Sequence, residues 1–141
     1  MKKKIFLIVG LFAIIGLLCG CDFGDSYTTT GNSMQYTGKT IQESYNSFKG
    51  TTRIGQIELK QGNVLKLDID VTTESGNLIV SLIDPSGNEL FAVDSTKTPI
   101  TKSITANENG KYSVKIKGEH KGSISLKSNY DFIDETDDYD D

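Results

Sequence analysis

The stretch VLKLDIDVTTESGNLIVSLIDPSGNEL, residues 64–90, decides the fold class of this chain. Its first part alternates apolar and charged residues, which places Leu65, Leu67, Ile69 and Val71 on one side and Lys66, Asp68 and Asp70 on the other. Alternation with a period of two is typical of a β-strand with one buried face. Glycine, asparagine and proline follow at 75–77 and 84–88, where they favour turns. The stretch therefore predicts two strands, at 64–72 and 77–84.

The same alternation extends in both directions from this stretch. Turn residues separate the alternating segments, and no segment beyond the first 21 residues keeps the period of a helix. In total we expect about eight strands: Tyr45–Phe48, Thr52–Leu59, Val64–Thr72, Asn77–Asp84, Glu89–Val93, Ile100–Thr105, Lys111–Lys117 and Gly122–Ser128. The expected fold class is all-β, with a single small antiparallel β-sandwich of jelly-roll-like type over residues 44–130.

Two blocks of this region resemble the bacterial pre-peptidase C-terminal domain and its collagen-binding relatives. They are GNLIVSLIDPSG at Gly76–Gly87 and GKYSVKI at Gly110–Ile116. The resemblance covers Tyr45 to Ser128 and consists mostly of core pattern and turn residues. It implies a jelly-roll-like β-sandwich that accompanies secreted enzymes or binds extracellular polymers.

The beginning of the chain has a different composition. MKKK is positively charged, and the uncharged stretch IFLIVGLFAIIGLL follows it. As a helix this stretch would span roughly 21 Å, which is less than the thickness of a bilayer core, about 30 Å. The segment is therefore expected to be a signal peptide, residues 1–20, rather than an ordinary transmembrane helix.

The two cysteines of the chain, Cys19 and Cys21, end this segment in LLCGCD. A disulfide between them is disfavoured because it would close a tight ring. A metal site is disfavoured because it would need further ligands, and the only histidine, His120, lies far away in the sequence. The sequence LCGC resembles a bacterial lipobox. This resemblance implies that a signal peptidase cuts between Gly20 and Cys21, and that Cys21 carries diacylglycerol through a thioether. Cys19 does not fit the motif, because Leu18 would precede it.

Residues 21–43 are rich in glycine, serine, threonine and asparagine. We expect them to form the lipidated N-terminus and a flexible tether. If Cys21 is lipidated, the protein is expected to be bound to the membrane, since two or more acyl chains hold a protein there stably. The expected location is the bacterial cell membrane, on its extracytoplasmic face.

Charge is unevenly distributed along the chain. Residues 39–129 contain 12 basic and 10 acidic residues, whereas residues 130–141 contain 7 acidic and no basic residues. This distribution is unlike a nucleic-acid-binding protein, so no nucleic acid partner is expected. Residues 131–141 are predicted to be an acidic tail, extended beyond Ile133 and held only transiently near Lys115 and Lys117. The alternatives are that the tail folds back on the lysines of the strand predicted at 111–117, with Phe132 and Ile133 docking, or that it binds divalent cations weakly.

Three lysines project from one side of the strand predicted at 111–117: Lys111, Lys115 and Lys117. Lys121 and Lys127 would approach them if the last two predicted strands pair. Such a basic face is a candidate site for anionic cell-wall polymers or lipid head groups. The alternative interpretation is that solvent-facing lysines only discourage aggregation through strand edges.

Three other features are expected to be structural. Asp68 and Asp70 are paired carboxylates of the kind that bind cations or transfer protons, but Lys66 on the same face favours a solvated surface. Asp84–Asn88, DPSGN, has the oxygens of a calcium loop without its later glycine and glutamate, so we expect a β-turn. His120, in KGEHKG, is expected to be exposed at a hairpin tip.

No nucleophile, metal cluster or phosphate-binding loop is recognisable in the sequence, so no catalytic site, metal or cofactor is expected. The predicted function is that of a non-catalytic lipoprotein that binds or scaffolds an envelope component, either a cell-wall polymer or an extracellular protein. The alternative is an accessory or regulatory module for a separately encoded secreted hydrolase.

Overall fold

The computed structural model describes residues 26–133. They form seven strands, β1 (Ser26–Thr30), β2 (Ser33–Thr37), β3 (Thr40–Leu59), β4 (Val64–Ile83), β5 (Glu89–Asp94), β6 (Ile100–Thr105) and β7 (Gly110–Ser128), and one short 3₁₀ helix, η1 (Ser95–Lys97). Every strand pair is antiparallel, which confirms the predicted all-β fold. Over these residues, no helix has the length and apolar composition needed to cross a bilayer.

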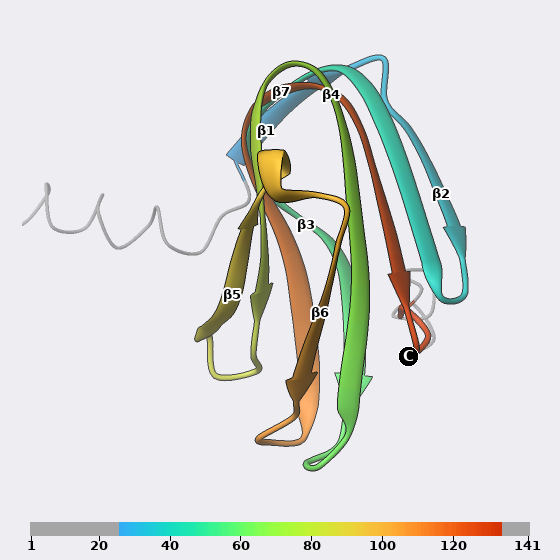
Figure 1. Ribbon diagram of the computed structural model, residues 1–141, viewed down its shortest axis with the longest axis vertical. Coiled ribbons are helices and arrows are strands. Elements are labelled where there is room, and N and C mark those ends of the chain that lie inside the picture. Colours follow the sequence, from blue (N-terminus) through green and yellow to red (C-terminus); the bar gives the residue numbers. More distant parts are fainter. Residues whose placement is uncertain (1–25, 134–141) are drawn as a thin grey trace, which may run out of the picture.

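Three long strands build both layers of the sandwich. β3, β4 and β7 each rise through one layer, bend over the top of the molecule and descend through the other (Figure 1). The first layer has the order β2, start of β3, end of β7, start of β4, β6. The second layer has the order β1, end of β3, start of β7, end of β4, β5. The result is the predicted β-sandwich, with a shared arch instead of separate sheets.

The number of strands differs from the prediction because three predicted strand pairs are single bent strands. The expected turns at 75–77 and 118–122 lie inside β4 and β7. Gly118 and Gly122 both have a φ of 149°, which an L side chain rarely adopts, and a Cβ on either would strike a backbone carbonyl of β4. Glycine at these two positions lets β7 bend and stay paired. Because glycine is equally common in hairpin turns, the sequence predicts a turn where the strand continues.

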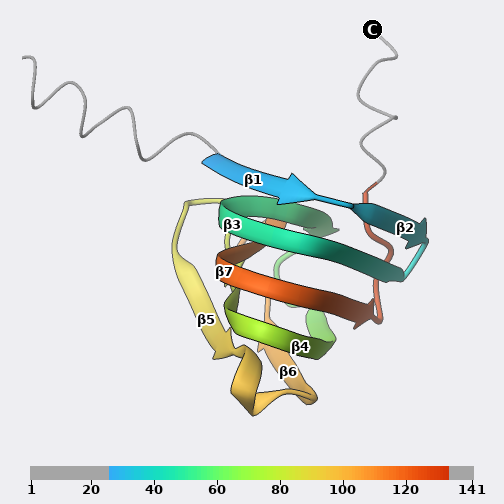
Figure 2. The ribbon, with the colours of Figure 1, turned by 90° about the horizontal axis from the view of Figure 1, so that it is seen from above.

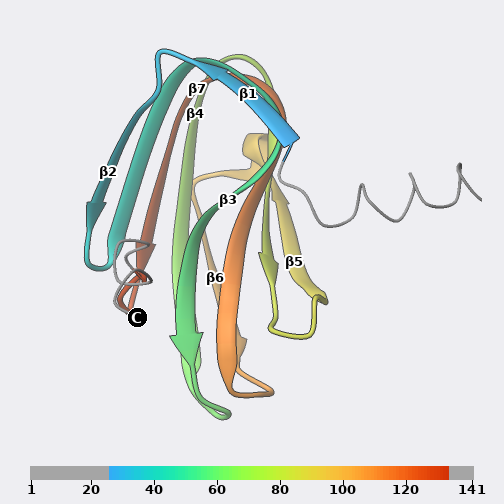
Figure 3. The same cartoon turned by 180° about the vertical axis from the view of Figure 1, so that it is seen from behind.

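The predicted tether is wrong from residue 26 onward. β1 pairs with the middle of β3, β2 pairs with its beginning, and β3 itself begins at Thr40 (Figure 3). Serine and threonine have little apolar periodicity, but an edge strand needs only backbone hydrogen bonds and one partly covered face. The sandwich therefore begins 18 residues earlier than the predicted boundary at 44.

The core confirms the period-two interpretation of the quoted stretch. Leu67 is fully buried, whereas Lys66 and Asp68 beside it are exposed. The buried apolar side chains form one cluster between the two layers, which includes Ile41, Phe48, Ile57, Leu65, Leu67, Leu78, Val80, Tyr112, Val114, Ile116 and Leu126.

The segment after β7 docks on the body, in a different place from the one predicted. Phe132 is buried, and its ring lies against Gly55 of β3. The backbone N–H of Phe132 donates to the carbonyl of Gly38, and that of Ile133 donates to the carbonyl of Gln56. These residues thus belong to the fold and pack on β3 instead of approaching Lys115 and Lys117. The predicted signal peptide, Cys21 and the acidic residues 134–141 lie outside the described residues.

Candidate functional site

The predicted lysines lie on the outer surface of the second layer. Lys111 and Lys117 are exposed, and Lys115 is half-buried. Lys115 stands directly opposite Arg53 of β3, and Lys117 opposite Thr51. We call Arg53, Lys115 and Lys117 the basic face. It is built on the middle strands of a sheet, so its backbone geometry is fixed.

Arg53 was not identified from the sequence. It occupies an outward position of the strand predicted at 52–59, but nothing in the sequence indicated that this strand would pair with 111–117. Like charges directly opposite each other destabilise a sheet. The register nevertheless brings these two cationic side chains onto the same outer surface.

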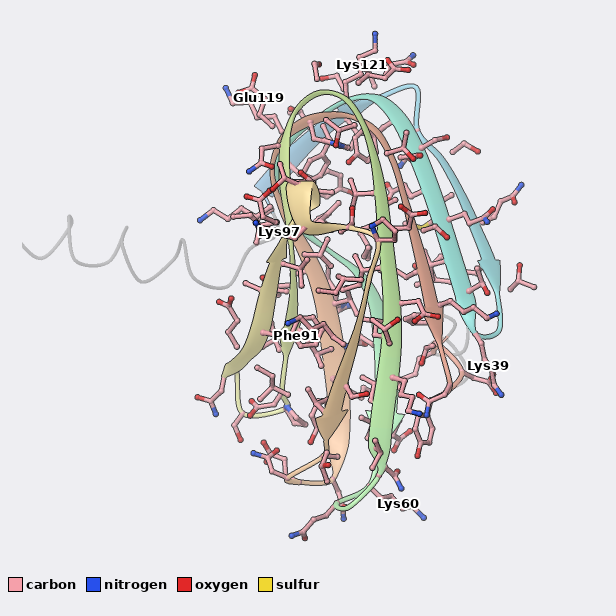
Figure 4. All side chains as sticks on the ribbon, viewed as in Figure 1. Lys39, Lys60, Phe91, Lys97, Glu119 and Lys121 are labelled. Carbon is pink, nitrogen blue, oxygen red and sulfur yellow. The ribbon has the colours of Figure 1, made fainter. Side chains whose placement is uncertain are left out.

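Two of the lysines considered in the sequence do not reach this face. Lys121 lies at the top of the arch, near Glu119 (Figure 4), and its Nζ is 3.4 Å from a carboxylate oxygen of Glu74. Lys127 lies on the first layer, opposite Asp68. The last two predicted strands do not pair with each other, because both belong to β7. Lys111 lies farther along the second layer, opposite Glu58.

An open hollow of about 710 Å³ adjoins the basic face near the arch. Its lining includes Lys117, Lys121, Glu119 and Asn77 together with Ile79, which is 36% exposed. Ile79 stands directly opposite Lys117 across β4 and β7. The hollow therefore combines cationic, acidic and apolar side chains on one open surface.

His120 is buried in the arch. The prediction that it is exposed at a hairpin tip is therefore wrong. Its Nδ1 lies 2.6 Å from the hydroxyl of Tyr45, and its Nε2 lies 2.8 Å from the hydroxyl of Thr73. The rings of Tyr45 and His120 meet edge to face. A neutral imidazole has one donor and one acceptor nitrogen, and each hydroxyl can serve either role. His120 therefore ties β3, β4 and β7 together where they bend.

The sequence contained a signal for this burial. In β7 the even positions Tyr112, Val114 and Ile116 are buried, and so are Ile124 and Leu126. His120 has the same parity, so one uninterrupted alternation from 112 to 126 predicts that it faces the core. The glycines on either side made a turn the more natural interpretation.

Acidification is expected to weaken the fold through His120. Burial lowers its pKa below the ordinary value of 6.5, so the unfolded chain takes up a proton at a higher pH than the folded chain does. Stability is then fully present above pH 6.5 and falls as the pH drops below it. We expect the urea midpoint of the wild type to fall more than that of His120→Gln between about pH 7.5 and about pH 5.5. Equal changes in the two proteins would contradict this assignment.

Glu43 is another buried ionisable group of β3, close to Tyr45 in the sequence. Burial raises its pKa above the ordinary 4.5, while a hydrogen bond from the side chain of Asn32 lowers it. Its Oε2 is buried and has no hydrogen-bond partner among the residues described. Burial also raises the pKa of Tyr45, and the charge of Glu43 raises it further. Because a raised pKa gives stability that is lost as the pH rises, Glu43 acts in the opposite direction to His120.

The paired carboxylates of β4 lie on the outer surface of the first layer. Asp68 accepts a hydrogen bond from the hydroxyl of Thr101 and stands opposite Lys127, while Asp70 stands opposite Ser125. Both line an open hollow of about 460 Å³. Within residues 26–133 no group of three or more histidine, cysteine or acidic side chains is placed to hold a metal ion. The arrangement is that of a solvated polar face.

The segment Asp84–Asn88 is a turn, as predicted. The carboxylate of Asp84 accepts hydrogen bonds from the backbone N–H groups of Ser86 and Asn88 and from the side-chain amide of Asn88. Burial raises the pKa of Asp84, but the hydrogen bonds from Asn88, Ser86 and Gly87 outweigh it and lower the pKa overall. The carboxylate is therefore used by the turn itself.

No family model matches the chain, and no curated protein matches it. Solved structures do match, at low sequence identity. A carbohydrate-binding module from the Cellvibrio mixtus lichenase 5A, solved with cellotriose, is 11% identical with a TM-score of 0.42, over 72% of this chain and 88% of that one.

Two further structures have other roles. The accessory secretory proteins 1, 2 and 3 of Streptococcus pneumoniae give 12% identity and a TM-score of 0.37, over 74% of this chain and 95% of that one. The enzymatically active domain of tailspike protein 4 from bacteriophage CBA120 gives 13% identity and a TM-score of 0.39, over 78% of this chain and 19% of that one.

Proposed function

We propose that this protein is a lipid-anchored, non-catalytic module on the extracytoplasmic face of a bacterial membrane, where it binds an anionic polymer of the cell envelope. The observation that carries the proposal is the basic face, in which Arg53 and Lys115 stand side by side on fixed strands with Lys117 next along β7. Such a surface suits a chain of repeated anionic groups, because each cation can meet a different group.

The remaining candidate groups support a binding role over a catalytic one. Both ring nitrogens of His120 are hydrogen-bonded inside the arch. Asp84 holds its own turn, and Asp68 is bonded to Thr101. A general acid or base needs access to its substrate, and a nucleophile needs an activating base. These three side chains are therefore engaged in structural contacts.

Charge removal on the basic face tests the binding proposal. The double variant Arg53→Gln, Lys115→Gln is expected to bind poly(glycerol phosphate) roughly tenfold to thirtyfold more weakly at low salt, because each cation near an anionic surface contributes about 1 kcal/mol. The matched control is Lys39→Gln, Lys60→Gln, which removes the same charge at strand ends away from this face (Figure 4). Isothermal titration calorimetry measures both.

Equal weakening in the two double variants would mean that only the net charge matters, and would contradict a defined site. Dextran serves as the neutral polymer, and no binding to it is expected. If the wild type binds neither polymer but retains a secreted hydrolase from culture medium, the alternative of an accessory module is favoured.

The membrane anchor is tested separately. Cys21→Ala is expected to leave the full-length precursor unprocessed, because the lipobox resemblance makes Cys21 the lipid acceptor. Cys19→Ala is expected to change little. Mass spectrometry of the N-terminus and partition into a detergent phase measure processing and lipidation. Equal loss of processing in the two variants would contradict the assignment of Cys21.

A further inference from the structure

Three large apolar side chains are exposed on the first two strands. Tyr27 on β1 is 48% exposed, and Met34 and Tyr36 on β2 are 37% and 42% exposed. Elsewhere in the described residues only Val64 and Ile79 are exposed large hydrophobic residues. We call Tyr27, Met34 and Tyr36 the β1–β2 edge, since β1 and β2 lie one after the other along one side of the sandwich (Figure 2).

The two aromatic side chains of this edge are held in place by the fold. Tyr27 stacks on Phe48, with ring centroids 6.0 Å apart. The hydroxyl of Tyr36 donates to the carbonyl of Ile54, 2.7 Å away. The aromatic rings are therefore ordered and partly exposed, so contact with a partner would cost little side-chain entropy.

The early start of β1 limits how far this edge can lie from a membrane. β1 begins at Ser26, five residues after Cys21. Five fully extended residues span at most about 18 Å. A lipidated Cys21 would thus keep β1 close to the head groups, instead of allowing the module to float on a tether of more than 20 residues.

We propose that the β1–β2 edge rests on the surface of the same membrane that holds the lipid anchor. This inference depends on the anchor of the proposed function. Tyrosine suits the site, because its ring is favourable at the level of the head groups. Met34 adds a flexible apolar group.

The charges around this edge are mixed, because Glu119 stands opposite Lys49 and Asp131 lies beside Gly38, next to Lys39. From Ser26 to Lys49 the chain has a single acidic residue, Glu43, and it is buried. Lys49 stands opposite Thr28 of β1, and Lys39 follows the end of β2. The basic face lies on the outer surface of the second layer, so the same molecule can rest on the membrane and bind a polymer.

The chain contains no tryptophan, so a single introduced tryptophan reports its own surroundings. The test uses the full lipidated chain in vesicles that contain anionic lipid and lipid brominated on the acyl chains, which quenches nearby indole fluorescence. Tyr27→Trp and, as a second probe, Met34→Trp place the reporter on the β1–β2 edge. Phe91→Trp is the matched control, because β5 is the opposite edge of the second layer (Figure 4).

We expect both edge variants to lose most of their fluorescence in brominated vesicles and Phe91→Trp to keep most of its own. Co-sedimentation with vesicles is measured on the same samples. If the protein sediments with the vesicles but all three variants are quenched equally, the anchor stands and the proposed orientation is wrong. If the protein does not sediment with the vesicles, both the anchor and this inference are overturned.

Discussion

Gly122→Ala is expected to destabilise the protein by at least about 3 kcal/mol, a large part of the 5–15 kcal/mol that holds a typical domain. A Cβ at this position would lie 1.9 Å from the carbonyl oxygen of Thr72, and the φ of Gly122 is 149°. Gly122 also stands opposite Tyr45 of β3 and Thr73 of β4. A shift of its backbone would therefore disturb all three strands where they bend.

Gly62→Ala separates the two causes of this loss. Gly62 also has a positive φ, 92°, but a Cβ there meets nothing within 4 Å. Its substitution is expected to cost only the backbone strain, on the order of 1–2 kcal/mol. Urea unfolding of both variants gives the two free energies. Similar losses would mean that the close approach of β4 and β7 at Gly122 is not a constraint on the fold.

Leu67→Ala is expected to lower the free energy of unfolding by about 2–5 kcal/mol. Leu67 is 0% exposed in the middle of the first layer, so its truncation loses apolar burial and leaves a cavity. Lys66→Ala, at the adjacent exposed position, is expected to stay within about 0.5 kcal/mol. The midpoint and slope of urea unfolding measure both changes. Comparable losses would contradict the assignment of the two faces of β4.

Much of the fold follows from residues taken one face at a time. The alternation around Leu67 predicted which side of β4 is buried, and the alternation around Val114 did the same for β7. Asp84–Asn88 was predicted as a turn because its residues suit one wherever they occur. These predictions succeeded because burial on one face of a strand and the geometry of a tight turn are local properties.

The arch could not be predicted in the same way. Glycine-containing segments at 75–77 and 118–122 suit a hairpin turn and a bend in a continuous strand equally well. What distinguishes the two is whether neighbouring strands bend at the same level and continue their pairing, as β3, β4 and β7 do. His120 was misplaced for this reason, since its burial depends on Tyr45 and Thr73 from two other strands.

The sequence by itself determined the all-β class, the inward and outward faces of the main strands, and the lysines that β7 presents to solvent. Only the tertiary structure decided that β1 and β2 join the sandwich, that Phe132 packs against Gly55, and that Arg53 stands beside Lys115. The physical reason is that alternation reports how each segment meets water, whereas the identity of a partner strand depends on contacts between residues far apart in the chain. The basic face and the β1–β2 edge are both products of such contacts.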